Sequence, residues 1–266
     1  LEALVESIAD GASVAIAPDY SGCAMAAVRA LIRKRVKDLH LVTVPQAGFQ
    51  ADMLIGAGCV ASVETAGVTL GEHGTAPRFS EAVRSGAIEI RDATCPAIHA
   101  ALQASEKGIP FMPLRGILGS DVLANRSDWR VIDNPFGADG PIVLLPAIRP
   151  DVALFHARRA DARGNVWVGV RRELMLMAHA AARTLVTVEE ITDGDLLADD
   201  AHAAGTIPAI YVSAVAEVPR GAWPVGLAGA YPPDSAHLAE YARLARTASG
   251  FEQYLDEHVR ARASAA

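Results

Sequence analysis

Short apolar runs rich in β-branched residues alternate along the chain with stretches whose apolar positions recur every three to four residues. The first run, residues 13–17, precedes apolar positions 25, 28, 31 and 32, which lie on one face of a helix. Further strands are predicted at residues 39–44, 60–63, 87–90, 142–145, 152–155, 185–188 and 207–212. Further helices are predicted at residues 96–107, 173–183, 236–246 and 251–266. This alternation predicts an α/β fold with a doubly wound, mainly parallel sheet and flanking helices.

The domain organisation follows from length and from one change in the pattern. The 266 residues, 51% of them hydrophobic, suffice for a single large α/β domain with a substantial core. Residues 110–150 are rich in Pro and Gly and lose the alternation. We therefore expect one domain over residues 1–266 with an irregular insertion or flap around residues 110–150.

Charge and cysteine content exclude several classes of function. The formal net charge of −7 argues against non-specific binding to nucleic acid or to anionic membranes. The three cysteines form neither a CxxC pair nor an even disulfide set, which predicts a reducing, cytoplasmic location. No apolar run reaches the roughly 20 residues of a membrane span, and the acidic start of the sequence lacks the cationic segment of a signal peptide.

The loop between the first predicted strand and helix, residues 17–23, is the first candidate for chemistry. Ligands bind at the carboxyl ends of strands in open α/β sheets, and helix N-termini favour anions. Ser21 and Gly22 are therefore candidate backbone donors to a phosphate, carboxylate or oxyanion. GxGxxG and GxxxxGK[ST] are both absent, so an ordinary strand-to-helix turn remains the alternative.

Other chemistry-bearing residues are scattered. Glu189 and Glu190 follow a predicted strand and are candidates for an acid, a base or a substrate anchor, or else a solvated pair. Cys23 and Cys95 precede predicted helices, where a thiol is activated, but a buried core cysteine is the favoured interpretation. No GxSxG motif occurs, and the eight histidines lack HxH or HxxxH spacing, so no metal site is expected. Turn-forming residues favour a structural connection at Asp161, Gly164 and Asn165.

Several segments, in order, resemble the α (alpha) subunit of family I coenzyme A transferases, especially the glutaconate-type branch. The most specific is residues 156–166, which contains His-Ala and Ala-Asp-Ala-Arg-Gly-Asn-Val. The other segments are residues 25–31, 38–43, 52–58, 108–116, 144–153, 186–191 and 217–222. Together they run from about Gly11 to Tyr241, which is most of the chain.

The resemblance implies a CoA-transferase-like fold of the NagB/RpiA type and a two-subunit enzyme that moves CoA from an acyl-CoA thioester to a carboxylic acid. In that family a glutamate of the β lobe attacks the thioester. This chain has no matching motif, so no catalytic residue is expected here, and the β subunit is the expected partner. No permanently bound cofactor is implied, because the CoA thioester is a substrate. The residues expected to line the substrate and CoA site are Tyr20, Ser21, Gly22, Gln46, Glu72, Cys95, Glu189 and Glu190.

This sequence departs from the family pattern at three places. Residues 17–22 replace a glycine-rich loop, and Trp223 stands where relatives often have His. Cys95 stands where related subunits often carry a glutamate, which is functional in a branch of ring-opening hydrolases. Two alternatives stay open: a CoA-transferase-fold hydrolase or ring-opening enzyme on a CoA thioester, and a small-molecule-sensing or scaffold module. Product analysis distinguishes the hydrolase from a transferase, because hydrolysis gives free acid without a new CoA ester. A chain that stays monomeric and binds a sugar phosphate would favour the sensing module.

Overall fold

The computed structural model describes residues 1–137 and 140–261, and its centre is a sheet in which seven strands run parallel. The spatial order starts with β12 (Ala214–Glu217), β10 (Arg183–Thr192) and β8 (Val152–Asp161). It continues through β1 (Ser13–Ile16), β2 (Leu39–Thr43), β3 (Val60–Thr65) and β4 (Glu89–Asp92). The expected doubly wound, mainly parallel sheet is confirmed, with β1 at its centre.

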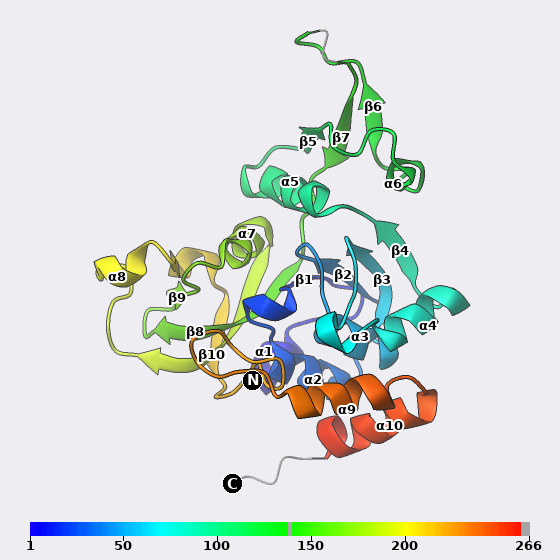
Figure 1. Cartoon of the computed structure of the whole chain (residues 1–266). Coiled ribbons are helices and arrows are strands. Elements are labelled where there is room, and N and C mark those ends of the chain that lie inside the picture. Colours follow the sequence, from blue (N-terminus) through cyan, green and yellow to red (C-terminus); the bar gives the residue numbers. More distant parts are fainter. Residues whose placement is uncertain (138–139, 262–266) are drawn as a thin grey trace.

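Helices cover both faces of this sheet (Figure 1). One face packs on α1 (Glu2–Glu6), α2 (Met25–Lys34), α3 (Phe49–Gly56), α4 (Pro77–Ser85), α9 (Ser235–Leu244) and α10 (Ala248–Leu255). The other packs on α5 (Cys95–Glu106) and α7 (Arg172–Ala180). Side chains of β1 alternate between the two, since Val14 and Ile16 join the first core and Ala15 the second.

The irregular segment forms a small sheet that projects from the main body beyond α5 (Figure 1). Its strands β5 (Phe111–Leu114), β7 (Ile142–Pro146) and β6 (Arg130–Ile132) are antiparallel and lie in that order, with α6 (Asp121–Ala124) between β5 and β6 in sequence. The predicted strand at residues 142–145 therefore forms, but outside the parallel sheet. Residues 138–139 of this segment lie outside the described residues.

Two further expectations about elements need correction. The strand predicted at residues 207–212 is only β11 (Thr206–Ile207), which pairs antiparallel with β9 (Val166–Trp167). Pro208 then ends it, since proline cannot donate to a ladder, and the parallel strand at this edge is β12 instead. The helix predicted at residues 251–266 is α10 followed by a π-helical turn, Asp256–Arg260, and residues 262–266 lie outside the described part. Among the described helices, none is long and apolar enough to cross a membrane.

Candidate functional site

The direction of chain winding changes between β1 and β8. β1 connects through α2 to β2 on one side, while β8 pairs with its other side. Crevices outside the carboxyl ends of strands at such a switch point are where open α/β sheets bind ligands. The β1–α2 loop and the segment His156–Arg158 of β8 form one wall each of a cavity of about 210 Å³ at this point.

Two more cavities adjoin the first around the same loop. One, of about 570 Å³, lies between Asp19, Tyr20, Arg171 and the loop of residues 225–233. The other, of about 290 Å³, is lined by Asp19 and Tyr20 together with Gln46 and the segment Gly71–His73. Because Tyr20 borders all three, we refer to them together as the cleft.

The β1–α2 loop is held against β8 by a close backbone approach. The Gly22 carbonyl accepts a hydrogen bond of 2.8 Å from the His156 N–H. Gly22 has a φ of 95°, and a Cβ there would lie 2.1 Å from the His156 carbonyl oxygen. Ser21 is buried, with its N–H bonded to the Pro18 carbonyl and its hydroxyl to Glu173. Its backbone donor is thus engaged within the loop and does not face a ligand.

Behind the loop, a buried chain of polar side chains begins at His156. Its Nε2 donates to Glu189 Oε1 at 2.6 Å, and its Nδ1 lies 2.8 Å from the Thr187 hydroxyl. Glu189 also accepts from the Tyr231 hydroxyl at 2.7 Å and from the Arg220 N–H at 2.7 Å. Burial lowers the pKa of His156, against the opposing effect of Glu189. Burial alone raises the pKa of Glu189, but its hydrogen bonds outweigh that effect and the pKa is lowered.

Asp19 supplies a carboxyl that titrates near neutral pH on the cleft wall. Burial raises its pKa to about 6, although the Phe49 N–H, the Cys23 thiol and the Gly48 N–H all favour the ionised form. The hydrogen bond from Phe49 to Oδ2 is 3.1 Å long. Gly48 is required beside it, because a Cβ there would lie 2.1 Å from Asp19 Oδ2. This carboxyl can therefore gain or lose a proton between the two cavities that it lines.

Two arginines give the cleft local positive charge. Arg158 lines the first cavity and stacks on Trp167, with 5.6 Å between the guanidinium carbon and the ring centroid. Arg171 lines the first and second cavities and lies 5.7 Å from the Tyr20 ring centroid. Within residues 1–137 and 140–261, neither has an ion-pair partner. Unpaired guanidinium groups beside a cavity favour a carboxylate or phosphate ligand.

The structure brings most of the predicted residues to the cleft. Tyr20, Ser21 and Gly22 border the first cavity, and Gln46 and Glu72 border the third, where the Glu72 side chain is 81% exposed. Glu189 lies one layer behind, in contact with His156.

The other predicted residues do not line the three cavities. Glu190 is outside the three cavities and pairs with Arg159 at 2.8 Å. Cys95 is exposed at the first turn of α5, so the favoured interpretation as a buried core cysteine is wrong for this residue. It nevertheless lies near the cleft. Burial has the largest effect on the pKa of Tyr20 and raises it, and the nearby Glu173 and Cys95 raise it further. Asp161, Gly164 and Asn165 form the turn between β8 and β9, where Asp161 accepts two bonds from Asn165.

Reasoning from the residues alone missed four side chains: Asp19, His156, Arg158 and Arg171. Asp19 lies within the strand-to-helix loop that the sequence marks as a candidate, and an acidic residue there is a usable signal. His156 stands out only as part of a segment that resembles the family. A histidine in a buried strand produces no recognisable sequence pattern. The two arginines stand out because they have no ion-pair partner in the described part of the chain, which the sequence does not show.

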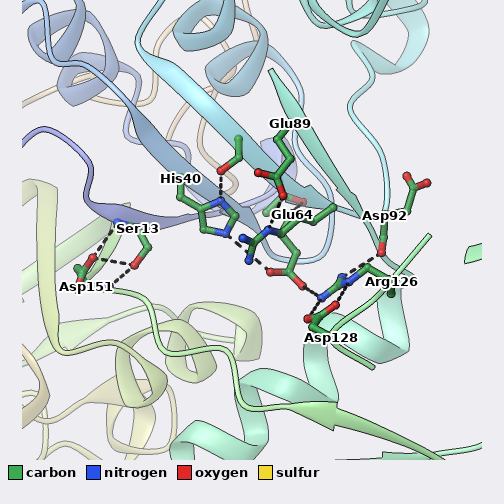
Figure 2. Close-up of polar contacts among 11 residues, drawn as sticks. Ser13, His40, Glu64, Glu89, Asp92, Arg126, Asp128 and Asp151 are labelled. Atoms are coloured by element: carbon green, nitrogen blue, oxygen red, sulfur yellow. Dashed lines mark hydrogen bonds and ion pairs between the residues drawn. The ribbon is translucent and has the colours of Figure 1, made fainter. Parts of the chain in front are cut away.

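A second polar cluster lies on the face of the sheet near the small insertion, and its residues point toward one another (Figure 2). Arg126 is 4% exposed and Glu64 is 6% exposed, with 2.8 Å between Nη2 and Oε1. Arg126 also bonds Asp128 through two nitrogens at 2.9 Å and the Asp92 carbonyl at 3.0 Å. His40 approaches the other Glu64 oxygen at 3.8 Å. Because these charged side chains pair with one another, we interpret the cluster as a set of ion pairs that fixes the small insertion to the main sheet.

The comparisons with known proteins agree with this architecture. The family model described as "Coenzyme A transferase" matches residues 1–218. A 3-oxoadipate CoA-transferase subunit from Pseudomonas knackmussii is 34% identical, over 97% of this chain and 92% of its own length. A cholesterol ring-cleaving hydrolase IpdA subunit from Mycobacterium tuberculosis is 32% identical, over 88% of this chain and 83% of its own length. An uncharacterized protein from Archaeoglobus fulgidus is 33% identical over 97% of this chain, which spans only 58% of that longer protein.

Solved structures give the same picture. The glutaconate coenzyme A-transferase of Acidaminococcus fermentans superposes with a TM-score of 0.89 at 26% identity, covering 97% of this chain and 86% of the other. A variant of the decarboxylase AibA/AibB superposes with a TM-score of 0.82 at 32% identity, covering 96% of both chains. The shared fold thus accompanies three named activities, so the substrate has to be argued from the cleft.

Proposed function

The chain belongs to the coenzyme A transferase family, and from that premise we propose that it is the α subunit of a two-subunit enzyme. The pair would move CoA between an acyl-CoA thioester and a carboxylic acid, with the nucleophilic glutamate supplied by the β subunit. The observation that carries this proposal is the cleft at the switch point, where Arg158 and Arg171 lie without ion-pair partners among the described residues. Both substrates are anions, and both would be attracted there.

The Glu189 and Asp19 carboxylates, behind the cleft and on its wall, are poorly suited to attack a thioester themselves. Both oxygens of Glu189 are engaged, one by His156 and Tyr231 and the other by the Arg220 N–H. Asp19 accepts hydrogen bonds from the Cys23 thiol and the Phe49 N–H. A nucleophile needs a free lone pair aimed at the substrate. This supports a nucleophilic glutamate on the partner, as the family resemblance implies.

The rim of the cleft supports the partner proposal. Val170 lines the first cavity and is 84% exposed. An apolar side chain at an open cavity mouth is favourable when a second subunit covers it. Closure by that subunit would also exclude water, which protects the mixed anhydride and glutamyl thioester that the resemblance implies. All three cysteines are unpaired, which supports a cytoplasmic location.

Within such a complex, this chain would bind and orient the substrates. Arg158 and Arg171 would hold substrate carboxylate or CoA phosphate groups. The His156–Glu189–Tyr231 chain would fix the β8 wall of the cleft, and Tyr20, which lines all three cavities, would donate its hydroxyl to a substrate oxygen. Fixed hydrogen-bond donors are most effective where water is excluded.

The proposal is tested by co-expressing the chain with the β-type subunit encoded beside its gene. We expect a stable complex that forms a new CoA ester from an acyl-CoA and an acceptor acid, while the separate chain shows no turnover. Val170→Asp should weaken the complex, whereas Val83→Asp, on α4 and outside the three cavities, should not. A stable complex without turnover on a broad panel of acyl-CoA esters and acids would contradict the transferase proposal.

Hydrolysis of a CoA thioester is a second candidate, and one observation favours it. Cys95 stands in place of the glutamate that is functional in the ring-opening branch, which argues against hydrolysis. Glu173 of α7, however, places another carboxylate near Tyr20 and His99. The Ser21 hydroxyl bonds to Glu173 Oε1, which leaves Oε2 of this carboxylate as a candidate base for activating water. Products distinguish the two activities, because hydrolysis releases free acid and free CoA thiol without a new CoA ester. Glu173→Gln should abolish hydrolysis and reduce transfer only in part.

A further inference from the structure

Outside the cleft, one group of titratable side chains converges between the last two helical elements. His237 and Glu240 lie one turn apart on α9, and His258 lies on the π-helical turn after α10. His237 Nδ1, one Glu240 oxygen and His258 Nε2 lie within 4.8 Å of one another. The sequence gives no metal spacing here, since 20 residues separate the two histidines and only the fold brings them together.

The distances between these atoms are too long for hydrogen bonds. Glu240 Oε2 lies 3.6 Å from His258 Nε2 and 4.0 Å from His237 Nδ1. A tetrahedral zinc ion with bonds of about 2.0–2.1 Å needs ligand atoms about 3.3 Å apart. The two distances to Glu240 are wider than that, and the three groups lie within 4.8 Å of one another, so side-chain rotations are needed to bring them around a cation.

Two further features suit a metal ligand set. The Tyr254 hydroxyl lies 2.8 Å from His237 Nε2, where it can accept the proton and leave Nδ1 free to bind metal. His258 Nε2 is shielded from solvent and has no hydrogen-bond partner among the described residues. A buried unsatisfied nitrogen requires an explanation, and a bound cation provides one.

The surrounding charge also favours a divalent cation. The Glu257 carboxylate, 3.8 Å from His258 Nε2, adds a second negative charge beside Glu240. Arg29, close to Trp223, is the positive group that opposes a cation.

We propose that His237, Glu240 and His258 form a zinc site that joins α9 to the C-terminal turn. Two imidazoles and one carboxylate are a typical zinc ligand set with one position left for water. The site is separate from the proposed CoA chemistry, because none of the three residues lines the cleft. Bound zinc would stabilise the folded chain, since the unfolded chain does not hold the three ligands together.

The test is calorimetric titration of the full chain with Zn²⁺ after removal of metal with EDTA. We expect one equivalent to bind and to raise Tm by about 5 °C or more at a hundredfold excess over Kd. His258→Gln and Glu240→Gln should each weaken binding at least about tenfold. His202→Gln is the matched control, because both histidine side chains are 25% exposed and His202 pairs with Asp199 outside the proposed metal site.

The exposed Cys95 thiol could bind zinc instead, so Cys95→Ser is titrated in parallel. Binding retained in Cys95→Ser and weakened in His258→Gln supports the site. Binding lost in Cys95→Ser, equal binding in His258→Gln and the wild type, or no saturable binding each overturns the proposal. All variants are checked for native circular dichroism, and Glu240→Gln serves if His258→Gln fails to fold.

Discussion

Gly22 is the residue on which the cleft geometry depends most directly. An alanine there would adopt an unfavourable φ of 95° and place its Cβ 2.1 Å from the His156 carbonyl oxygen. We expect Gly22→Ala to lower the free energy of unfolding by at least about 2 kcal/mol, because backbone strain and a backbone clash add. Urea denaturation measures this loss.

Gly86→Ala is the control, since Gly86 has a φ of 70° but no atom within 4 Å of its ideal Cβ. It should cost only about 1 kcal/mol. Equal losses at the two positions would mean that the loop moves freely away from β8.

Asp52 predicts a pH dependence of stability. It is fully buried, accepts from the Tyr241 hydroxyl and the Phe79 N–H at 2.7 Å each, and burial raises its pKa from 3.8 to about 6. A carboxyl with a raised pKa contributes stability below the unfolded pKa and loses it as pH rises through the folded value. Because asparagine cannot ionise, the stability of Asp52→Asn relative to the wild type should rise by about 2 kcal/mol between about pH 4 and pH 8.

Urea denaturation across that pH range measures the difference. Asp193→Asn makes the same chemical change at an exposed position and should show a smaller pH dependence. A difference for Asp52→Asn that does not change with pH would show that this carboxyl is not destabilised by burial.

At single positions, the sequence predicts best where a residue follows a recognisable element. Glu189 is found because it follows an apolar strand, and Tyr20 to Gly22 because they connect a strand to a helix. His156 cannot be found in this way, since its neighbours Gly22 and Glu189 come from distant parts of the chain. Cys95 is misplaced because a thiol before a helix has no sequence signal for exposure.

At the scale of elements, the Arg126–Glu64 pair connects the small insertion to β3. Removing one partner of a buried ion pair leaves an uncompensated charge and typically costs about 3–5 kcal/mol. We therefore expect Arg126→Met to lower the free energy of unfolding by about that amount, measured by urea denaturation.

The Glu64→Gln, Arg126→Met double variant should lose less than the two single variants together, since no buried charge is left unpaired and Asp128 is 46% exposed. Additive losses would indicate that the two side chains do not interact in solution. The exposed pair Arg84–Glu81 on α4 is the control, and breaking it should cost about 1 kcal/mol or less.

The elements that the sequence predicts correctly are those with clear periodicity. The central strands β1, β2 and β3 and the amphipathic helix α2 follow from local pattern. α3 is missed because residues 49–55 are all buried, so its sequence shows no polar face. The strand predicted at residues 142–145 is right locally, but nothing local tells an antiparallel insertion from a strand of the main sheet.

At the scale of the whole molecule, the formal net charge of −7 opposes the proposed binding of polyanionic coenzyme A. Binding must therefore depend on local charge, because fields are screened beyond about 8 Å at physiological ionic strength. In the cleft, Arg158 and Arg171 supply that charge, beside the Asp19 and Glu72 carboxylates that line the second and third cavities.

This distinction can be tested with two variants that change the net charge equally. In the complete αβ enzyme, Arg171→Gln should raise KM for the acyl-CoA about tenfold, because one charge-assisted hydrogen bond contributes about 1.5–3 kcal/mol. Arg243→Gln, at an exposed position of α9 outside the cleft, should change KM less than about twofold, since its charge is screened. Increasing salt should raise KM for the wild type, and should raise it less for Arg171→Gln, in which only Arg158 remains in the cleft. Equal effects of the two substitutions would instead mean that the overall field governs binding, and the anion site would then have to lie on the partner subunit.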